Sequence, residues 1–529
     1  MRIEREIGMR SIEKVGRESG HIKREPVSNL LYPSLKSLQF NPKPEVLLLY
    51  FQREISGLGD TFDEFNPLVH LRPQMGLLCL SAAARSIGVE AVVLDQRAIQ
   101  YSLEDIASLV CQHEIRTIGV YSSSMHADTN AKMINRLSAI TDGVTIVVGG
   151  PGHPNYKLFL ENGATIVCHG EGEETFNDII RKVQCGDLDW SSVDGISYKV
   201  SGNVIQNKPR TLIENIDDLP FPVRNYPLPL TTYRDYYLMA YRAPYVTMMT
   251  VRGCPYSCTF CYSSAQWNFK VRQRSPENVL EEIDYLVKDY GIKFIDFLDD
   301  VFGLTYSWVE EFSRKLIERK YDLTYKALIN PNTFASKQAK AIELLSKSGC
   351  KILGIGMQTA DSGTLELVKR TPMSREKLIE AVANAKRNRI LTFVSFIVGF
   401  PKEPEDAPEQ IMGLIDDARP TLIDCYPLMY IKDTKLAKQV ASGELSEAWS
   451  HDEAVERADR VKRHFYRSPR NISAILTWVL MNNPGWYLRM LTQWRLLLNI
   501  AGFNIFRSKK DARSRYVFTE DTLDENRTF

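Results

Sequence analysis

Two long stretches of the chain alternate short apolar runs with segments in which apolar residues recur every three or four positions. In the first stretch the apolar runs are EVLLLY (45–50), EAVVLD (90–95), TIGVYS (117–122), TIVVGG (145–150) and ATIVCHG (164–170). Runs of this length predict buried β-strands, and intervening segments such as MGLLCLSAAARSIG (75–88) predict helices. This alternation favours a doubly wound parallel sheet of the Rossmann or flavodoxin-like kind.

A second alternation begins at YVTMMTVRGC (245–254). Its further predicted strands are KFIDFLDD (293–300), TYKALIN (324–330), KILGIGMQT (351–359), ILTFVSFIVGFP (390–401) and LIDCYPLMY (422–430). Helical periodicity is predicted between these strands, beginning with NVLEEIDYLVKDYG (278–291). About six such units indicate a partial or full β/α barrel, in which catalytic groups belong at the carboxyl ends of the strands.

The two alternations divide the chain into regions of an α/β protein. We expect an N-terminal arm (1–43), a sheet domain (44–185), a linker (186–240), a barrel (241–440) and a helical C-terminal region with a charged tail (441–529). The linker contains DLPFPVRNYPLPL (218–230), a proline-rich stretch typical of a segment that crosses between domains.

Composition narrows the class of protein. The chain has 529 residues with 66 Lys and Arg against 65 Asp and Glu, so no bulk charge favours nucleic acid. The N-terminal MRIEREIGMR lacks the apolar core of a secretory signal, and the run 390–400 is too short to span a bilayer. We therefore expect a cytoplasmic protein, whose nine cysteines serve metal binding, catalysis or burial rather than disulfides.

Three of the nine cysteines lie close together in RGCPYSCTFC (252–261). Cys254, Cys258 and Cys261 form C-x3-C-x2-C, which lets three thiolates converge on zinc or an iron–sulfur centre. Zinc normally takes a fourth His or Cys, and none occurs between residues 262 and 349. A [4Fe–4S] cluster on three thiolates leaves one iron open to a substrate or cofactor. The simpler alternative is three buried cysteines without a metal.

Residues 245–430 resemble the radical SAM superfamily, whose signature C-x3-C-x-aromatic-C is matched by Cys254, Cys258, Phe260 and Cys261. In that family the open iron binds the amino and carboxylate groups of S-adenosylmethionine (SAM). An electron from the cluster then cleaves SAM to methionine and a 5′-deoxyadenosyl radical. The resemblance implies an external electron donor such as flavodoxin or ferredoxin.

Further segments of the barrel resemble the parts of this family that contact SAM. Asp299 and Asp300 in IDFLDD are candidates for the SAM amino group, and Gly399 and Pro401 match a glycine–proline turn near adenine. Gln358 in GIGMQTAD stands where the family usually has glutamate, which leaves hydrogen bonding but removes a charged contact. Taken singly, each segment also fits an ordinary core strand or turn.

The preceding sheet resembles the cobalamin-binding domain found before many radical SAM barrels. The matching segments are residues 71–95 and IVVGGPGHPNYKLFLENGATIVCHGEGEETF (146–176). Four glycines let the backbone approach a large flat ligand, and a glutamate between two of them is a further candidate contact. These candidates are Gly149, Gly150, Gly170, Glu171 and Gly172. The simpler reading is that the glycines only turn the chain.

The sequence departs from cobalamin domains that ligate cobalt through a histidine. It lacks their D-x-H-x-x-G motif, and neither His126 nor His153 has the required spacing. Radical SAM relatives commonly lack this ligand too, and some have lost cobalamin. The lower face of the corrin is then expected against the 51–66 or the 121–127 loop.

The resemblance implies a cobalamin-dependent methyltransferase that acts on an unactivated carbon of a small-molecule or lipid-like substrate. One SAM would methylate cob(I)alamin, and a second would yield the radical that activates the substrate. The alternatives are ring formation, ring contraction or oxidation without methyl transfer, and a non-catalytic cobalamin or iron–sulfur sensor.

The C-terminal segment 472–503 carries Trp478, Trp486 and Trp494 among leucines and arginines and is interrupted by Pro484. An apolar, basic segment of this kind is typical of a peripheral contact with a membrane surface. The alternative, which we favour, is a helical cap packed on the barrel.

Overall fold

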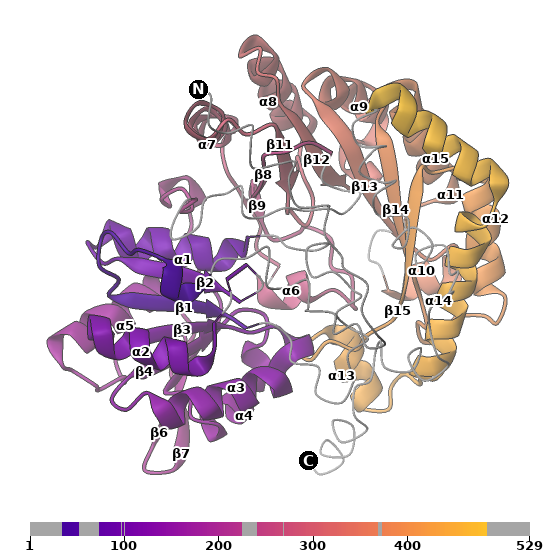
Figure 1. Ribbon diagram of the computed structural model, residues 1–529. Coiled ribbons are helices and arrows are strands. Elements are labelled where there is room, and N and C mark those ends of the chain that lie inside the picture. Colours follow the sequence, from indigo (N-terminus) through magenta and orange to yellow (C-terminus); the bar gives the residue numbers. More distant parts are fainter. Residues whose placement is uncertain are drawn as a thin grey trace, which may run out of the picture. The chain divides into compact units, whose positions relative to one another are not determined.

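The computed structural model describes residues 34–51, 73–96, 98–99, 101–224, 241–267, 269–368 and 373–483 (Figure 1). Most of the expected N-terminal arm lies outside these residues, as do residues 52–66 of the first predicted loop. Residues 225–240 of the linker and everything from Pro484 onward, including Trp486 and Trp494, also lie outside them.

The first sheet has seven described strands in the order β2-β1-β3-β4-β5-β6-β7. They are β1 (Val46–Tyr50), β2 (Ala91–Asp95), β3 (Thr117–Tyr121), β4 (Thr145–Gly149), β5 (Ile166–Cys168), β6 (Ile196–Val200) and β7 (Asn203–Gln206). β1 to β5 are parallel, which confirms the predicted doubly wound sheet. β6 and β7 add antiparallel strands and continue this sheet into the range expected as linker.

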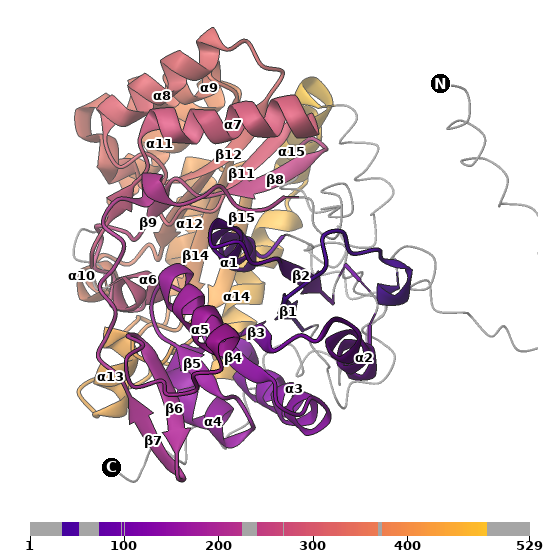
Figure 2. The same cartoon turned by 90° about the vertical axis from the view of Figure 1, so that its left-hand side faces the viewer.

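Helices cover both faces of this sheet (Figures 1 and 2). One face carries α1 (Met75–Ser86) and α5 (Glu173–Cys185), and the other carries α2 (Leu103–His113), α3 (Ala127–Ile140) and α4 (Tyr156–Glu161). From β1 the chain continues to β2 on one side of β1 and then crosses to β3 on its other side. The strand order therefore reverses at β1. Ligands of such sheets bind beyond the carboxyl ends of the strands at this reversal.

The second sheet is a parallel, partial β/α barrel, as predicted. Its described strands follow the order β15-β14-β13-β12-β11-β8, with β8 and β15 at the edges. They are β8 (Tyr245–Met248), β11 (Phe294–Phe297), β12 (Thr324–Ile329), β13 (Cys350–Gln358), β14 (Leu391–Val398) and β15 (Leu422–Pro427). The outer helices are α7 (Pro276–Tyr290), α8 (Tyr306–Glu318), α9 (Gln338–Lys347), α11 (Arg375–Arg387) and α12 (Ala407–Ala418) (Figure 2).

Local sequence sets the limits of these helices. α7 begins with Pro276 after Ser275, whose hydroxyl accepts a hydrogen bond from the amide of Asn278, and it ends at Gly291 with φ +62°. Proline in the first turn and glycine after the last turn are the residues that helix ends favour. The boundaries of α7 therefore follow from residues that adjoin it in the chain.

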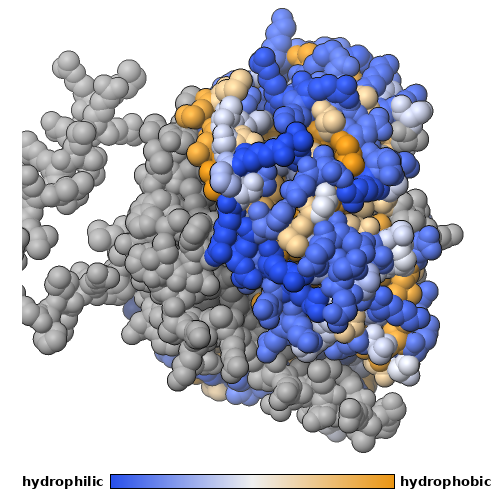
Figure 3. All heavy atoms as spheres, turned by 90° about the vertical axis from the view of Figure 1, so that its right-hand side faces the viewer, coloured by the Kyte–Doolittle hydropathy of each residue, from blue (hydrophilic) through white to orange (hydrophobic). Residues whose placement is uncertain are grey.

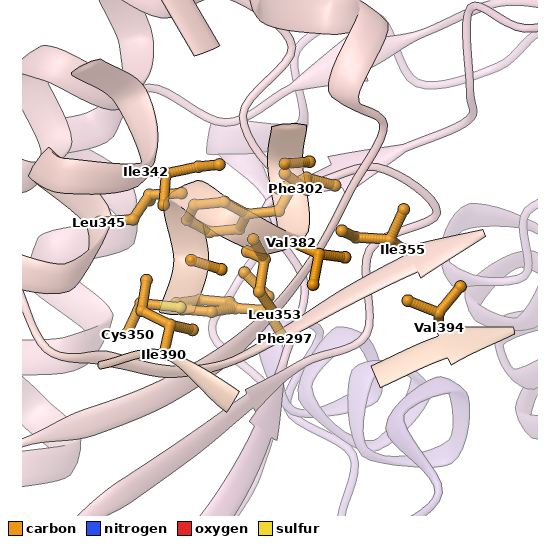
Figure 4. Close-up of a cluster of buried hydrophobic side chains, with 14 of the residues drawn as sticks. Phe297, Phe302, Ile342, Leu345, Cys350, Leu353, Ile355, Val382, Ile390 and Val394 are labelled. Carbon is orange, nitrogen blue, oxygen red and sulfur yellow. The ribbon is translucent and has the colours of Figure 1, made fainter. Parts of the chain in front are cut away.

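The hydrophobic core of the barrel lies between the sheet and the outer helices. Figure 4 shows Phe297 and Phe302 packed among Ile342, Leu345 and Leu353. On β14 the outward-facing side chains of Val394 and Phe396 are fully buried. The residues that alternate with them, Phe393, Ser395 and Ile397, are partly exposed. Ser395 and Ile397 thus leave the inner face of β14 partly exposed towards the carboxyl end of the strand, where a catalytic site is expected.

The C-terminal helices complete the barrel. They are α13 (Lys435–Ala441), α14 (His451–Tyr466) and α15 (Pro469–Asn482). α15 packs Ile475, Trp478 and Val479 against a cluster that includes Tyr245 and Phe294 at the amino ends of the strands. This part of the predicted 472–503 segment is thus a helical cap on the barrel. Among the described helices, none combines the length and apolar character needed to cross a bilayer.

Candidate active site

The three cysteines lie in the loop between β9 (Val251–Arg252) and α6 (Tyr262–Gln266), at the carboxyl end of β8. β9 pairs antiparallel with β10 (Arg272–Gln273). Gly253 precedes the first cysteine with φ +96°, and a Cβ there would lie 2.2 Å from the carbonyl oxygen of Lys270. Only glycine fits this position, because any side chain would collide with backbone.

The thiols of Cys254, Cys258 and Cys261 are partly exposed, and none of the chain's nine cysteines, all described, forms a disulfide. Burial, together with the negative charges of Asp300, Cys261 and Cys258, raises the pKa of Cys254 to about 12. The loop thus retains the Cys254 proton until a cation binds, and binding releases it. Within the described residues, no three His, Cys, Asp or Glu side chains are grouped closely enough to hold a single metal ion.

The carboxylate of Asp299 holds the strand that leads into the cysteine loop. It accepts hydrogen bonds from the Thr250 amide (2.6 Å), the Thr250 hydroxyl (2.7 Å) and the Val251 amide (3.0 Å). Burial raises the pKa of Asp299 to about 7 in spite of these bonds. Asp300 is exposed and accepts a hydrogen bond from the Ser263 hydroxyl at 2.5 Å. Of the two candidate acids, Asp300 is the one that faces outward beside α6.

The aromatic residue of the signature, Phe260, is a packing residue. Its ring lies 5.2 Å from that of Phe400 in an edge-to-face contact, among buried residues from the ends of β14 and β15. The amide of the preceding Thr259 donates to the carbonyl of Val368, the last residue of α10 (Ser362–Val368), at 2.9 Å. The amide of Leu436 in turn donates to the Thr259 carbonyl at 2.8 Å. The middle of the loop is therefore anchored across the top of the barrel.

The turn after β14 is built around a glutamate that sequence reasoning missed. Glu403 accepts hydrogen bonds from the amides of Gly399 (2.6 Å) and Phe400 (3.2 Å) and from the Thr359 hydroxyl (3.1 Å). Gly399 has φ +102°, which favours glycine, and Pro401 follows two residues later. Burial raises the pKa of Glu403 to about 7. Glu403 thus ties the predicted Gly399–Pro401 turn to the end of β13.

Gln358 ends β13 with φ +78°, an uncommon conformation for a residue with a side chain. A Cβ on Gly356 would lie 2.6 Å from the side-chain nitrogen Nε2 of Gln358, so this glycine makes room for the side-chain amide. The pairing of β13 with β14 shifts register between these two residues. The role of Gln358 as a contact to SAM stays a prediction.

The candidate glycines of the first sheet lie in two loops at the carboxyl ends of β4 and β5. Gly150 has φ +93°, and a Cβ there would lie 2.7 Å from the Ser122 carbonyl oxygen. Gly170 has φ +76° with nothing within 4 Å of an added Cβ. Gly149 and Gly172 have ordinary backbone angles. Gly150 is therefore required by the turn itself, whereas Gly170 has open space around the position of an added Cβ.

Two histidines of these loops lie together beside the cysteine loop. The ring of His153 is 5.2 Å from that of His169, and its Nδ1 is 3.2 Å from the hydroxyl of Tyr262. Burial lowers the pKa of both histidines, that of His169 to about 4, so both rings are neutral at pH 7. His126 lies in the loop after β3, with its Nδ1 2.8 Å from the Ser123 hydroxyl.

Glu171, a predicted cofactor contact, forms ion pairs with the barrel. Its carboxylate lies 2.5 Å from Nη1 of Arg252 and 2.6 Å from Nη1 of Arg272. Glu173 pairs with Nη2 of Arg252 at 2.5 Å. Burial opposes the charge on Glu173, yet the Arg252 guanidinium holds the pKa of this carboxyl below its usual range. These four charges join the first sheet to β9 and β10, and the sequence offered no signal that paired them.

Two parts of the chain each match a known family. Residues 248–415 match the Radical SAM superfamily, and residues 70–180 match the B12 binding domain. An uncharacterized methyltransferase of Pyrococcus horikoshii is 32% identical over 367 residues, which cover 67% of this chain and 76% of the relative. The chain belongs to the cobalamin-binding radical SAM proteins. Its cofactors are accordingly a [4Fe–4S] cluster, SAM and cobalamin.

Two further proteins are similar to this chain at lower identity. The methyltransferase TsrM from Kitasatospora setae, solved with cobalamin and a [4Fe–4S] cluster bound, is 18% identical with a TM-score of 0.61 over 76% of this chain and 75% of TsrM. The anaerobic magnesium-protoporphyrin IX monomethyl ester cyclase of Rubrivivax gelatinosus is 28% identical over 290 residues, which cover 53% of this chain and 50% of the cyclase. Relatives at similar identity are thus named as a methyltransferase and as a cyclase.

The residues of the site fit these cofactors. Three thiols share one loop at the top of the barrel, as a cluster with one open iron requires. The open backbone at Gly170 and the neutral rings of His153 and His169 lie at the strand ends where the first sheet binds its ligand.

Proposed function

We propose that this protein is a cobalamin-dependent radical SAM methyltransferase that adds a methyl group to an unactivated carbon of a small molecule. The observation that carries the proposal is the contact between Tyr262, next to Cys261, and His153, in the loop after β4 (3.2 Å). Through it the cysteine loop and a loop of the B12 binding domain face the same space. Cofactors held by these two loops would lie near one another, so that one substrate carbon would be placed between them.

Each part of the chain has a distinct task in this proposal. When bound, SAM and the cluster supply a hydrogen-abstracting radical, and cobalamin supplies the methyl group. Cys254, Cys258 and Cys261 hold the cluster, while Asp300 and Gln358 orient SAM through hydrogen bonds. The inner face of the barrel, with Ser395 and Ile397 partly exposed, receives the substrate. An external donor such as flavodoxin or ferredoxin supplies electrons.

Ring formation is the second candidate function. It is favoured by the cyclase of Rubrivivax gelatinosus, whose identity of 28% is close to the 32% of the methyltransferase relative. A methyltransferase leaves a SAM-derived methyl group in its product, and a cyclase does not.

The test uses anaerobically reconstituted protein, SAM with a deuterated methyl group, a chemical reductant and a small-molecule extract. The expected result is a metabolite that carries the labelled methyl group, with one S-adenosylhomocysteine and one 5′-deoxyadenosine formed for each. Cys258→Ala is expected to form no 5′-deoxyadenosine, whereas Cys111→Ala, which removes an exposed thiol on α2, is expected to behave as the wild type. A product formed with 5′-deoxyadenosine alone would refute methyl transfer and favour the cyclase.

We further propose a cytoplasmic protein with a peripheral membrane contact through segment 472–503. α15 exposes an apolar stripe on the side away from the barrel, formed by Ile472, Leu476, Leu480 and Met481. Figure 3 faces the side that carries α12, α14 and α15 and shows hydrophobic side chains grouped at the upper left of the coloured surface. No acidic residue occurs between residues 469 and 510, so this part of the chain suits an anionic surface.

A further inference from the structure

The B12 binding domain holds the cysteine loop at both of its ends. At the first end, Arg252 lies two residues before Cys254, and its two terminal nitrogens pair with Glu171 and Glu173 at 2.5 Å each. At the second end, Tyr262 directly follows Cys261, and its hydroxyl lies 3.2 Å from Nδ1 of His153. Both contacts involve loops or residues that follow β4 and β5, where the domain is expected to bind cobalamin.

The first contact is rigid because it is buried and charge-balanced. The side chains of Arg252, Glu171 and Glu173 are each at most 9% exposed, and Arg272 adds a second guanidinium to the two carboxylates. Glu171 also accepts a hydrogen bond from the amide of Ile213 at 2.8 Å. Removing one member leaves a buried charge without its partner, so the arrangement tolerates little displacement.

The second contact uses a single ring nitrogen. Nδ1 of His153 lies 3.3 Å from the carbonyl oxygen of Gly150 and 3.2 Å from the hydroxyl oxygen of Tyr262. With its proton on Nδ1 the ring donates to Gly150, and with its proton on Nε2 it accepts from the Tyr262 hydroxyl. The glycine loop of the first sheet and the end of the cysteine loop are thereby tied through one imidazole ring.

We propose that Arg252 and Tyr262 are positioning residues, which set the place of the cysteine loop relative to the loops that hold cobalamin. They touch neither cofactor in this proposal and act through the cysteines that they flank. The inference rests on the proposed function, because it requires both cofactors in one protein. Group transfer between two sites is sensitive to placement, and a shift of about 1 Å can lower a rate about 100-fold.

The alternative is that these contacts only stabilise the association of the two domains. Arg274 provides a matched control, because its guanidinium pairs with Glu282 of α7 at 2.6 Å and its side chain is 10% exposed, yet both residues belong to the barrel. Arg274→Met removes a buried ion pair of similar length and burial without cutting a link to the B12 binding domain. A purely structural role predicts the same outcome for both arginines.

The experiment compares Arg252→Met, Arg252→Lys, Tyr262→Phe and Arg274→Met as anaerobic holoproteins reduced to the paramagnetic states of cobalamin and cluster. The readout is the microwave power needed to saturate the electron paramagnetic resonance signal of cobalt. This power falls as cobalt moves away from the cluster, because the cluster relaxes faster. We expect a clear fall for Arg252→Met, a smaller fall for Tyr262→Phe, and recovery with Arg252→Lys. Arg274→Met should match the wild type at equal cofactor content.

A second readout is the ratio of S-adenosylhomocysteine to 5′-deoxyadenosine formed, which we expect to fall on the order of tenfold in Arg252→Met. Equal behaviour of Arg252→Met and Arg274→Met would overturn the positioning role. If Arg252→Met does not fold, Glu171→Gln keeps the shape of the site and tests the same link. A wild-type protein without the cobalamin spectrum would defeat the proposed function itself. If the wild type holds both cofactors but neither readout changes in the variants, only the positioning role is refuted.

Discussion

Asp299, which follows the second strand of the barrel, forms two short hydrogen bonds with Thr250, which precedes the strand that enters the cysteine loop. The carboxylate accepts from both the amide and the hydroxyl of Thr250, at 2.6 and 2.7 Å. Both groups are buried, and Thr250 lies four residues before Cys254. The start of the loop is therefore fixed by a side chain from the segment that follows β11.

Asp299→Ala should destabilise the protein and lower its iron content. The substitution leaves the buried amides of Thr250 and Val251 without an acceptor, at about 1–3 kcal/mol for each unsatisfied group. Asp299→Asn keeps an acceptor oxygen and should retain most of both properties. Urea unfolding and iron analysis after reconstitution measure the two effects. Equal iron content in Asp299→Ala and the wild type would contradict the anchoring role.

Glu403 should make stability depend on pH. Its pKa is raised from 4.5 to about 7 by burial, so the folded protein binds its proton more tightly than the unfolded chain. This stabilisation is complete below pH 4.5 and is lost as the pH rises through about 7. Glu403→Gln should flatten the fall in unfolding free energy over this window. Asp299 contributes a fall of the same sign, so the double variant with Asp299→Asn should be flatter still.

A pH profile of unfolding in urea checks this prediction. Glu366→Gln is a suitable control, since it removes a carboxyl of the same kind from the exposed face of α10. An unchanged slope in Glu403→Gln would show that the folded protein keeps this carboxyl charged.

Gly170→Phe should block cobalamin binding with little loss of stability. Both Gly170 and Gly143 have positive φ, +76° and +70°, with nothing within 4 Å of an added Cβ. The backbone strain of the two substitutions is therefore similar, on the order of 1–3 kcal/mol. Gly143 lies before β4, at the opposite end of the strands from the expected ligand. Titration with hydroxocobalamin, followed by absorbance, should show weakened binding for Gly170→Phe and wild-type binding for Gly143→Phe.

If both glycine variants bind cobalamin as tightly as the wild type, the cofactor binds elsewhere. Loss of binding in both variants would indicate a general loss of the fold, which thermal unfolding would reveal.

Exposed residues of α15 should contribute to membrane binding. Leu480 and Met481 are 50% and 77% exposed, and replacing both by Glu adds negative charge without emptying a core position. We expect this variant to lose flotation with vesicles that contain anionic lipid. A chain ending at Asn483 is the appropriate truncation, because α14 buries Val461 and Phe465 in the barrel core. Ile205→Glu on the exposed strand β7 is the control. Wild-type protein that does not float would refute the membrane contact.

Much of the fold was predictable because its information is local. The apolar runs predicted β1 to β5 of the first sheet and the six strands of the second sheet, and the helical periodicity at 75–88 and 278–291 matches α1 and α7. α2 begins at Ser102, whose side chain caps the helix together with Asp105 three residues later. Signals of this kind lie within a few residues of the element that they define.

The cysteine loop was predictable for the same reason, whereas its supports were not. Cys254, Cys258 and Cys261 lie within eight consecutive positions, so their spacing is visible in the chain. Arg252 lies 81 residues after Glu171, and Glu403 lies 44 residues after Thr359. No local pattern pairs charges at such separations. The sequence therefore predicted Glu171 as a cofactor contact without its ion pairs.

The sequence by itself determined the two alternations of strand and helix and the three clustered thiols, since hydrophobic periodicity and cysteine spacing are properties of neighbouring residues. Only the tertiary structure decided the strand order, the partial exposure of Ser395 and Ile397 on the inner face of β14, and the contacts that tie Arg252 and Tyr262 to the first sheet. These depend on which distant segments pack together, a choice that burial and charge pairing make across the whole chain.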